Sequence, residues 1–272
     1  MKKLFLSAVA VIGLMGANYT IMPYGAFLSY DNSVKDKGYI GGIYGTIYKS
    51  PIKFEYGIER DIIQYKDTTP DWKQWNFTGV FNFFKGYNYV FRAGLNHLKV
   101  SQGNTKENDN VYILGALYYK YLNYNSGIDF YHSKYKDFKV NQVSLKYGKY
   151  FKNYDGTFYF EIKPNFIFIS DKIKANTPKK NYTDVDFKLT ATKWPWMTTL
   201  KASVGKNAYK VENGGFVVYN LGEEYKYNYG INVSRYFKNI GTFSIGFSRS
   251  KFSENNQDSY LNVYLLTYTR AF

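Results

Sequence analysis

The chain has 272 residues, of which 45% are apolar, 21% are charged and 21% are aromatic, and it contains two histidines and no cysteine. This composition excludes a disordered or fibrous protein, a disulfide framework and a thiolate metal site. The formal net charge of +15 predicts an anionic partner, which by charge alone is lipopolysaccharide, a membrane surface or nucleic acid.

The first residues predict an export signal. A basic start is followed by an apolar run over residues 4–15, which is too short to span a membrane as a helix. Gly16 and Ala17 are small residues that suit cleavage. We therefore expect residues 1–17 to be a signal peptide and residues 18–272 to form a single domain. Export also argues against a nucleic-acid partner.

The rest of the sequence alternates with a period of two between apolar or aromatic residues and polar, small or charged ones. Phe243, Ile245 and Phe247 share one face of a predicted strand, and Ser244 and Gly246 share the other. Each alternating segment predicts a strand. The fourteen segments are 19–30, 38–49, 52–65, 72–84, 87–100, 110–122, 126–133, 140–152, 156–170, 181–193, 196–206, 224–237, 240–251 and 258–272. Sixteen and twelve strands are the alternative counts.

Two architectures fit this alternation. In a secreted sandwich the apolar faces of two sheets meet, whereas in a membrane barrel they contact lipid and the polar faces line a wet lumen. Most segments run roughly 11 to 15 residues, which exceeds soluble strands and suffices to cross a bilayer at a tilt. Trp72, Trp75, Trp194 and Trp196 near segment ends suit interfacial girdles. We therefore predict an all-β, transmembrane, antiparallel up-and-down β-barrel.

The connections between the segments are of two alternating kinds. Tight turns are predicted at 49–51, 85–86, 123–126, 153–156, 194–196 and 238–240, and longer polar links at 31–38, 66–71, 101–109, 133–139, 171–181, 206–223 and 253–258. Short periplasmic turns and longer external loops are typical of outer-membrane barrels, and an even strand count puts both termini on the periplasmic side.

Many lysines lie in or beside the longer links. They are Lys35, Lys37, Lys66, Lys106, Lys134, Lys136, Lys139, Lys172, Lys174, Lys179 and Lys180. Lysines in external loops suit the phosphates of lipopolysaccharide. Simple solvation of the loops is the alternative interpretation.

The polar faces of the strands predict a lumen lined by seven basic and seven acidic residues. They are Lys53, Glu55, Glu59, Asp61, Arg92, Asp129, Lys146, Glu161, Lys163, Asp184, Asp186, Lys188, Lys201 and Lys226. Opposed charges would create a transverse field across a water-filled pore, or would neutralise one another in a plugged one. Fourteen strands leave room for water, by extrapolation from smaller and larger barrels. The balance of charges leaves the preferred ion sign open, and we expect no metal or other cofactor.

The link 206–223 is the best candidate for a constricting or docking loop. It carries Gly214 and Gly215 followed by Phe216 and, three residues later, Tyr219. Long loops of this kind are often functional. The alternative is a hairpin that extends beyond the membrane.

The last strand carries a family resemblance. Tyr264, Leu266, Tyr268 and the final Phe272 share one face. This pattern resembles the closing-strand signal of Gram-negative outer-membrane β-barrel proteins, which the barrel assembly machinery recognises. Arg270 departs from it, because an apolar residue is usual there, although a long basic side chain can reach water near the interface. The resemblance spans the whole sequence and identifies no subfamily. It implies location in the bacterial outer membrane, with lipid, lipopolysaccharide and the assembly machinery as partners.

The function of such a scaffold must lie in its lumen or its loops. We expect a porin-like channel for passive diffusion of small hydrophilic solutes or ions. The alternatives are a non-conducting structural, adhesive or assembly barrel that acts through external loops and a membrane-embedded hydrolase. A hydrolase needs a base beside its nucleophile, but His97 and His132 lie on outward faces by parity and no HExxH, GxSxG or GxxxxGK[ST] motif occurs. We therefore predict that the protein is not an enzyme.

Overall fold

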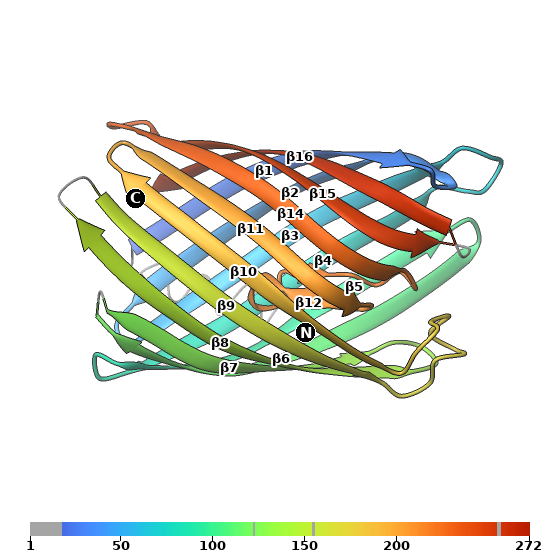
Figure 1. The fold of residues 1–272 in the computed structure, drawn as a ribbon, viewed down its shortest axis with the longest axis horizontal. Coiled ribbons are helices and arrows are strands. Elements are labelled where there is room, and N and C mark those ends of the chain that lie inside the picture. The colour runs from blue at the N-terminus through green and yellow to red at the C-terminus, as the bar shows by residue number, and fades with distance from the viewer. Residues whose placement is uncertain (1–17, 122, 154–155, 255–256) are drawn as a thin grey trace.

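The computed structural model describes residues 18–272 except 122, 154–155 and 255–256, so the predicted signal peptide lies outside the described residues. The described chain forms a closed antiparallel barrel (Figure 1), and the predicted count of fourteen strands is confirmed. The barrel strands are β1 (Asn18–Asp31), β2 (Lys35–Lys49), β3 (Ile52–Tyr65), β4 (Trp72–Lys85), β5 (Tyr89–Gln102), β6 (Thr105–Lys120), β7 (Tyr124–Lys134), β8 (Lys139–Asn153), β9 (Gly156–Ile169), β10 (Asn181–Lys193), β11 (Trp196–Asn207), β14 (Glu224–Phe237), β15 (Gly241–Glu254) and β16 (Gln257–Ala271).

Pairing of the first and last strands closes the sheet. Leu265 of β16 lies opposite Ala26 of β1, and every other barrel strand pairs with the next one in the wall. β11 pairs directly with β14, because the short strands β12 (Val211–Glu212) and β13 (Val217–Val218) pair only with each other. Closure leaves no sheet edge unpaired, which is what a β structure in lipid requires.

The two ends of the barrel differ in their connections. We call the end at which every connection between strands has only two or three residues the turn end; β16 also ends there. The opposite end, which has the longer connections 66–71, 170–180 and 208–223, is the loop end. Some predicted longer links are shorter than expected, because the alternation continues into them and extends the pairing. β5 and β6 pair as far as Gln102 opposite Thr105, so the link predicted at 101–109 shrinks to the turn Gly103-Asn104. The long connections that remain are 170–180 and 208–223.

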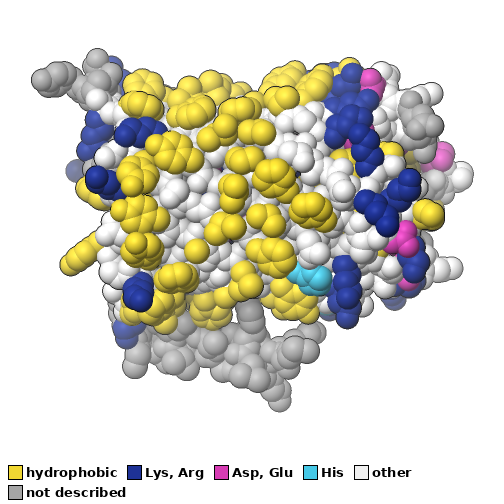
Figure 2. Space-filling model, turned by 60° about the horizontal axis from the view of Figure 1, so that its bottom comes forward, with side chains coloured by type: hydrophobic (Ala, Val, Ile, Leu, Met, Phe, Trp, Pro, Cys, Tyr) yellow, Lys and Arg dark blue, Asp and Glu magenta, His cyan; other side chains and the backbone are white. Residues whose placement is uncertain are grey.

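The outward face of the wall is apolar. Ile58, Leu114 and Ile245, from three separate strands, are 48%, 56% and 64% exposed. Figure 2 shows apolar side chains spread across the middle of one face, with lysine and arginine side chains gathered toward the two ends. A surface with this many exposed rings and aliphatic chains is suited to lipid rather than water. Among the described residues, no helix is long and apolar enough to cross a bilayer.

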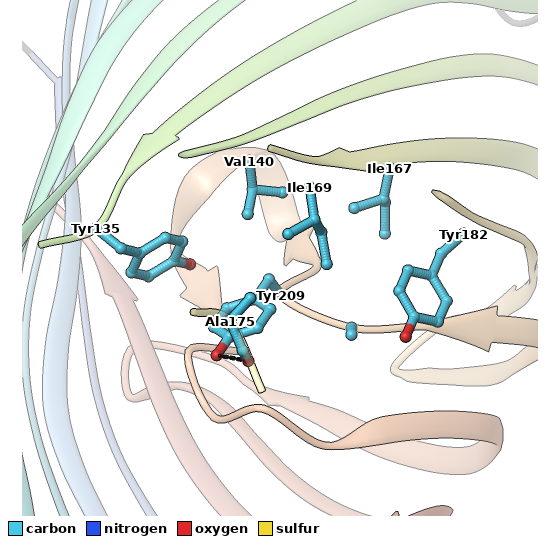
Figure 3. Close-up of a cluster of buried hydrophobic side chains, with 8 residues drawn as sticks. Tyr135, Val140, Ile167, Ile169, Ala175, Tyr182 and Tyr209 are labelled. Atoms are coloured by element: carbon cyan, nitrogen blue, oxygen red, sulfur yellow. Dashed lines mark hydrogen bonds between the residues drawn. The ribbon is translucent and has the colours of Figure 1, made fainter. Parts of the chain in front are cut away.

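Inside the barrel, the loop end holds apolar clusters that the alternation did not predict. One cluster comprises Leu28, Tyr30, Ile63, Trp72, Tyr225, Phe252 and Leu261. A second, shown in Figure 3, comprises Tyr135, Val140, Ile167, Ile169, Ala175, Tyr182, Ala208 and Tyr209. The loop end is therefore packed like the core of a soluble protein.

Two aromatic residues near strand ends face the interior, and one of them, Trp72, was expected in an interfacial girdle. Trp72 is only 6% exposed and packs inside, because it shares parity with the inward Gln74. Tyr225 also faces inward, since the register of β14 against β15 shifts between Tyr225 and Tyr227. Such a bulge inverts the alternation on one side of it.

Candidate functional site

The segment 208–223 lies inside the barrel and does not extend above it (Figure 1). We call it the lumen hairpin. It contains β12, a 3₁₀ turn over Asn213–Gly215, and β13. Val211 and Val218 pack with the partly buried Phe216 against an inward-facing apolar cluster. The wall residues of this cluster are Val80, Leu98, Val111, Ile113 and Tyr131, which belong to β4 to β7.

Polar side chains of the wall hold the backbone of the hairpin. Arg92 Nη2 donates to the carbonyl oxygen of Gly214 at 3.3 Å, and Asn96 Nδ2 donates to that of Gly215 at 2.9 Å. Gln142 donates to the carbonyl oxygen of Val211 at 2.9 Å and accepts from its N–H at 2.8 Å. These bonds join residues that are 69 to 122 positions apart, so they tie the hairpin to the wall across the lumen.

The two glycines are required by the close approach of the hairpin to the wall. Gly214 and Gly215 have φ values of +69° and +100°, a region that favours glycine. A Cβ atom at Gly215 would lie 2.1 Å from Cδ1 of Ile113, and one at Gly214 would lie 2.2 Å from Nη2 of Arg92. A side chain at either position would push the hairpin away from β5 and β6.

Lys210 anchors the opposite side of the hairpin through a buried ionic network. It is 1% exposed, and its Nζ lies 2.7 Å from Asp184, 2.5 Å from Asp186 and 2.9 Å from Glu212. Burial by itself would lower the pKa of Lys210, but the carboxylates of Glu212, Asp184 and Asp186 raise it well above its usual value. The ammonium is therefore charged at neutral pH, and the network fixes the base of the hairpin to β10.

The loop end is closed by further contacts of the hairpin and of residues 170–180. Tyr209 donates to the carbonyl oxygen of Ala175 at 2.7 Å, as Figure 3 shows. Lys35 is buried and forms ion pairs with Glu223 and, at 3.2 Å, with Glu254. The interpretation of Lys35 as an external lysine is thus wrong, because its side chain points into the barrel and its charge is already neutralised.

A cavity of about 810 Å³ lies in the lumen beside the hairpin. Its wall reaches Phe84, Val90 and Tyr119, which lie within a few residues of tight turns, so the cavity extends toward the turn end. Glu212, Asn213, Gly214, Phe216 and Val217 of the hairpin also line it. Eleven of the residues expected in the lumen line this cavity: Lys53, Glu55, Glu59, Arg92, Asp129, Lys146, Glu161, Lys163, Asp186, Lys188 and Lys201.

The other three expected lumen residues lie elsewhere. Asp61 and Asp184 are buried inside the barrel, where Asp61 accepts from Gln74 at 3.1 Å and Asp184 contacts Lys210. Lys226 lies at the register shift of β14 and pairs at 2.5 Å with Asp258, a carboxylate that Lys251 also contacts at 2.7 Å. The structure does not place Lys226 in the lumen, because the bulge turns its side chain toward the rim of the loop end.

Most carboxylates of the cavity already have protein partners. Glu55 lies 2.5 Å from Nζ of Lys53 and 3.7 Å from Nη2 of Arg92, which also approaches Asp129 at 3.4 Å. Glu59 accepts hydrogen bonds from Tyr24 at 2.7 Å and from Asn76 at 2.6 Å. Glu161 accepts one from Tyr159 at 2.5 Å.

The four residues expected to constrict the lumen all belong to the hairpin, at different depths. Phe216 faces the cavity and packs edge-on against Tyr44, with 5.1 Å between ring centres. Tyr219 packs against Tyr225 in the loop-end cluster, with ring centres 5.0 Å apart. Sequence reasoning missed the anchors Lys210 and Gln142, since no local pattern marks a lysine in a polar link as buried.

The two histidines lie in similar outward settings. Nδ1 of His97 lies 3.0 Å from Oδ1 of Asn110, and Nδ1 of His132 lies 2.7 Å from Oδ1 of Asn141, in each case on the next strand. Neither ring forms an ion pair with any carboxylate of the described chain. Nothing in this arrangement resembles a base beside a nucleophile.

The residues of the closing-strand pattern lie on the outer face of β16 and, for Phe272, directly after it. Tyr264, Leu266 and Phe272 are 50%, 58% and 63% exposed, and Tyr268 donates to the carbonyl oxygen of Ile240 at 2.6 Å. The Arg270 guanidinium lies over the ring of Phe272 at 5.1 Å. This stacking lets an arginine share an otherwise apolar face.

Comparisons with known proteins identify the fold but do not assign a family. No protein-family model and no curated protein matches the sequence. A mutant of the TodX monoaromatic hydrocarbon channel is similar in structure, with a TM-score of 0.62, 9% identity, and coverage of 94% of this chain and 91% of that one. A bacterial polysaccharide outer membrane secretin has a TM-score of 0.59, with 9% identity and coverage of 93% and 98%. The outer membrane protein OpdK of Pseudomonas aeruginosa fits less closely, with a TM-score of 0.46, 8% identity and coverage of 94% and 99%. The chain shares the β-barrel fold of such outer-membrane proteins.

Proposed function

We propose that this protein is a bacterial outer-membrane channel through which small hydrophilic solutes or ions diffuse passively. The observation that carries the proposal is a cavity of about 810 Å³, lined by charged side chains, inside a barrel whose exterior is apolar. An apolar exterior suits lipid, and a charged interior suits water and hydrophilic solutes. One protein of similar fold is itself a hydrocarbon channel, which is in keeping with a conducting barrel.

We further propose that the lumen hairpin is the constriction of this channel. It borders the cavity through Gly214 and Phe216 and fills the space between the cavity and the loop end. Solutes that enter at the turn end therefore meet the hairpin before they reach the loop end. Conduction then depends on how far the hairpin moves from β5 and β6.

Single-channel recording of the refolded protein in a planar bilayer tests the function. We expect stable steps of current that grow linearly with voltage. The far-ultraviolet circular dichroism of the same sample checks that the barrel is folded. A folded barrel that never conducts would contradict the channel.

The packed loop end favours one second candidate, a non-conducting barrel that acts through its external loops. The apolar clusters and the Lys35–Glu223 ion pair would keep such a barrel shut. Recording a variant without the hairpin separates the two functions. If the variant conducts and the unmodified protein does not, the hairpin keeps the native barrel closed, and the second candidate is favoured.

Location and partners follow from the same proposal. We propose that residues 1–17 direct export, that the turn end faces the periplasm, and that the face carrying Tyr264, Leu266, Tyr268 and Phe272 is read by the barrel assembly machinery. The exposed lysines of the loop end would then bind lipopolysaccharide phosphates. Loss of Phe272 should lower the amount of folded protein in the outer membrane, and an equal amount would contradict its role in assembly. Dephosphorylated lipopolysaccharide should bind more weakly than the phosphorylated form, and equal binding would contradict the role of the lysines.

A further inference from the structure

We propose that four lysines on one wall of the cavity form a binding site for oxyanions, so that the solutes this barrel takes up carry a carboxylate or phosphate group. The four are Lys146 of β8, Lys163 of β9, Lys188 of β10 and Lys201 of β11, and all of them line the cavity. We call them the lysine wall. The assignment of the ligand as a transported solute rests on the proposed channel function, whereas the site itself rests on the observations that follow.

The register of the sheet places these lysines side by side. Lys188 lies directly opposite Lys201. The register that pairs Ser144 with Asn165 and Tyr147 with Ile162 brings Lys146 opposite Lys163. Like charges directly opposite one another destabilise a sheet. Two such pairs on neighbouring strands therefore have no structural benefit, and they point to a ligand that offsets their repulsion.

Glycines border the lysine wall on both sides. Gly127 of β7 lies opposite Lys146, and Gly230 of β14 lies opposite Lys201. The two flanking strands thus present no side chain at the positions directly opposite Lys146 and Lys201. The space in front of the wall belongs to the cavity.

The donors and acceptors of this region are unequally satisfied. Lys163 and Lys188 lie opposite Asp186 and Glu161 in the register. Those carboxylates have other partners, since Asp186 accepts from Lys210 at 2.5 Å and Glu161 from Tyr159 at 2.5 Å.

The lysines themselves have none of these partners. Within the described ranges, no ammonium group of the lysine wall forms an ion pair or a hydrogen bond; Lys188 only lies over the ring of Tyr159 at 5.5 Å. Each ammonium carries three N–H donors and no acceptor. In this cavity the carboxylates are already paired and the ammonium groups of the lysine wall are not. A ligand that supplies hydrogen-bond acceptors and negative charge, namely an oxyanion, would pair with them.

The described residues of the opposite wall offer an anion no unpaired cation. β3 lies across the barrel from β10, seven strands away in the wall, and carries Glu55 and Glu59 into the cavity. The cations nearest to Glu55 are Lys53 and Arg92, which it already binds. The carboxylates of Glu55 and Glu59 are therefore matched in number by Lys53 and Arg92, whereas the lysine wall carries unpaired positive charge, which produces a field across a cavity with low-dielectric walls. An oxyanion therefore has one favourable side.

Calorimetric titration of the refolded, detergent-solubilised protein with inorganic phosphate, succinate and glucose tests the site. We expect phosphate or succinate to bind and uncharged glucose not to bind. The variant Lys163→Gln/Lys188→Gln/Lys201→Gln should weaken anion binding by about tenfold or more, because three charge-assisted contacts are lost. Lys53→Gln is the matched control, since it removes a charge from the same cavity but its ammonium is already paired with Glu55; its effect should stay within about twofold.

The outcomes separate the site from the channel. Absence of phosphate and succinate binding by the folded protein overturns the site, and so does an equal loss in the triple variant and in Lys53→Gln. Binding of phosphate alone or of succinate alone supports the site and identifies the anionic group that it selects. A barrel that binds anions through the lysine wall but never conducts overturns the channel and leaves the site. A conducting barrel whose anion binding does not depend on these lysines overturns the site and leaves the channel.

Discussion

The two halves of the barrel interior are built on different principles. At the loop end, Phe252 is fully buried among other rings, and the ion pair of Lys35 with Glu223 is enclosed with them. Toward the turn end, by contrast, Lys188 and Lys201 border a cavity, and neither forms an ion pair within the described residues. One half is packed with apolar side chains that exclude water, and the other keeps charged side chains around a cavity.

This contrast shows that the wall alone does not decide whether a barrel is open. The same fourteen strands run through both halves, with the same alternation. The loop end is closed because the lumen hairpin and residues 170–180 supply apolar side chains and hydrogen-bond partners to inward-facing wall residues. The properties of the channel therefore depend on the few contacts that hold the hairpin.

Removal of the hairpin should have the largest effect. If residues 211–218 are replaced by a short Gly/Ser linker, the packing in front of β4 to β7 is lost and the cavity should open toward the loop end. We expect the single-channel conductance to rise by about twofold or more, because a barrel of this size has room for water. The same linker in place of the exposed residues 66–68, in the connection between β3 and β4, is the control. Equal conductance in all three proteins would show that the hairpin does not constrict the path.

Loss of the buried ammonium should come next. Lys210→Met leaves Asp184, Asp186 and Glu212 without their shared cation. Breaking a buried ionic network by removing one partner costs about 3–5 kcal/mol, so we expect lower stability in urea together with more frequent open states. A second variant that also carries Asp184→Asn and Asp186→Asn should recover most of the stability. Equal stability of Lys210→Met and the unmodified protein would contradict the anchoring role.

The same anchor predicts the response to alkaline pH. The neighbouring carboxylates raise the pKa of Lys210 in the folded protein above 10.5, the ordinary value of lysine. A raised folded-state pKa means that the stabilisation is complete below the ordinary value and is lost as the pH rises through the folded-state pKa. We expect conductance to stay constant from about pH 7 to about pH 10 and to increase only above that range. Lys210→Arg should shift the increase in conductance to higher pH. An increase in the conductance of the unmodified protein below about pH 9 would contradict the role of Lys210 as the anchor.

The alternation predicts the wall better than it predicts the site. Phe81 and Asn82 lie outside and inside as their parity requires, because one rule of side-chain direction holds along a regular strand. The rule fails at Lys226, where a one-residue bulge inverts it, and no sequence signal marks that bulge. It also gives no information on Lys210, whose burial depends on contacts with strands that are distant in the sequence. Parity thus identifies most lumen-facing charges, and only the three-dimensional structure tells which of them are already paired.

A smaller effect is expected from a side chain at the closest contact of the hairpin. Gly215→Val places a Cβ atom within 2.1 Å of Ile113 at a φ of +100°, which costs about 1–3 kcal/mol of strain. We expect partial displacement of the hairpin, seen as additional conductance levels in single-channel records. Gly41→Val is the matched control, because a Cβ atom there would meet nothing within 4 Å. Records identical to those of the unmodified protein would show that the hairpin tolerates the displacement.

The smallest effect should come from a lysine whose sequence position suggests the lumen and whose contacts place it at the rim. Lys226 pairs with Asp258, and exposed ion pairs of this kind contribute little to stability. Because Asp258 also contacts Lys251, it keeps a cation when Lys226 is replaced. We expect Lys226→Gln to leave both the conductance and the phosphate titration unchanged. Lys201→Gln, which removes one of the four lysines of the lysine wall, should weaken phosphate binding. If the two variants weakened phosphate binding equally, the side chain of Lys226 would face the lumen, as uninterrupted alternation predicts, and the register shift of β14 would not place it at the rim.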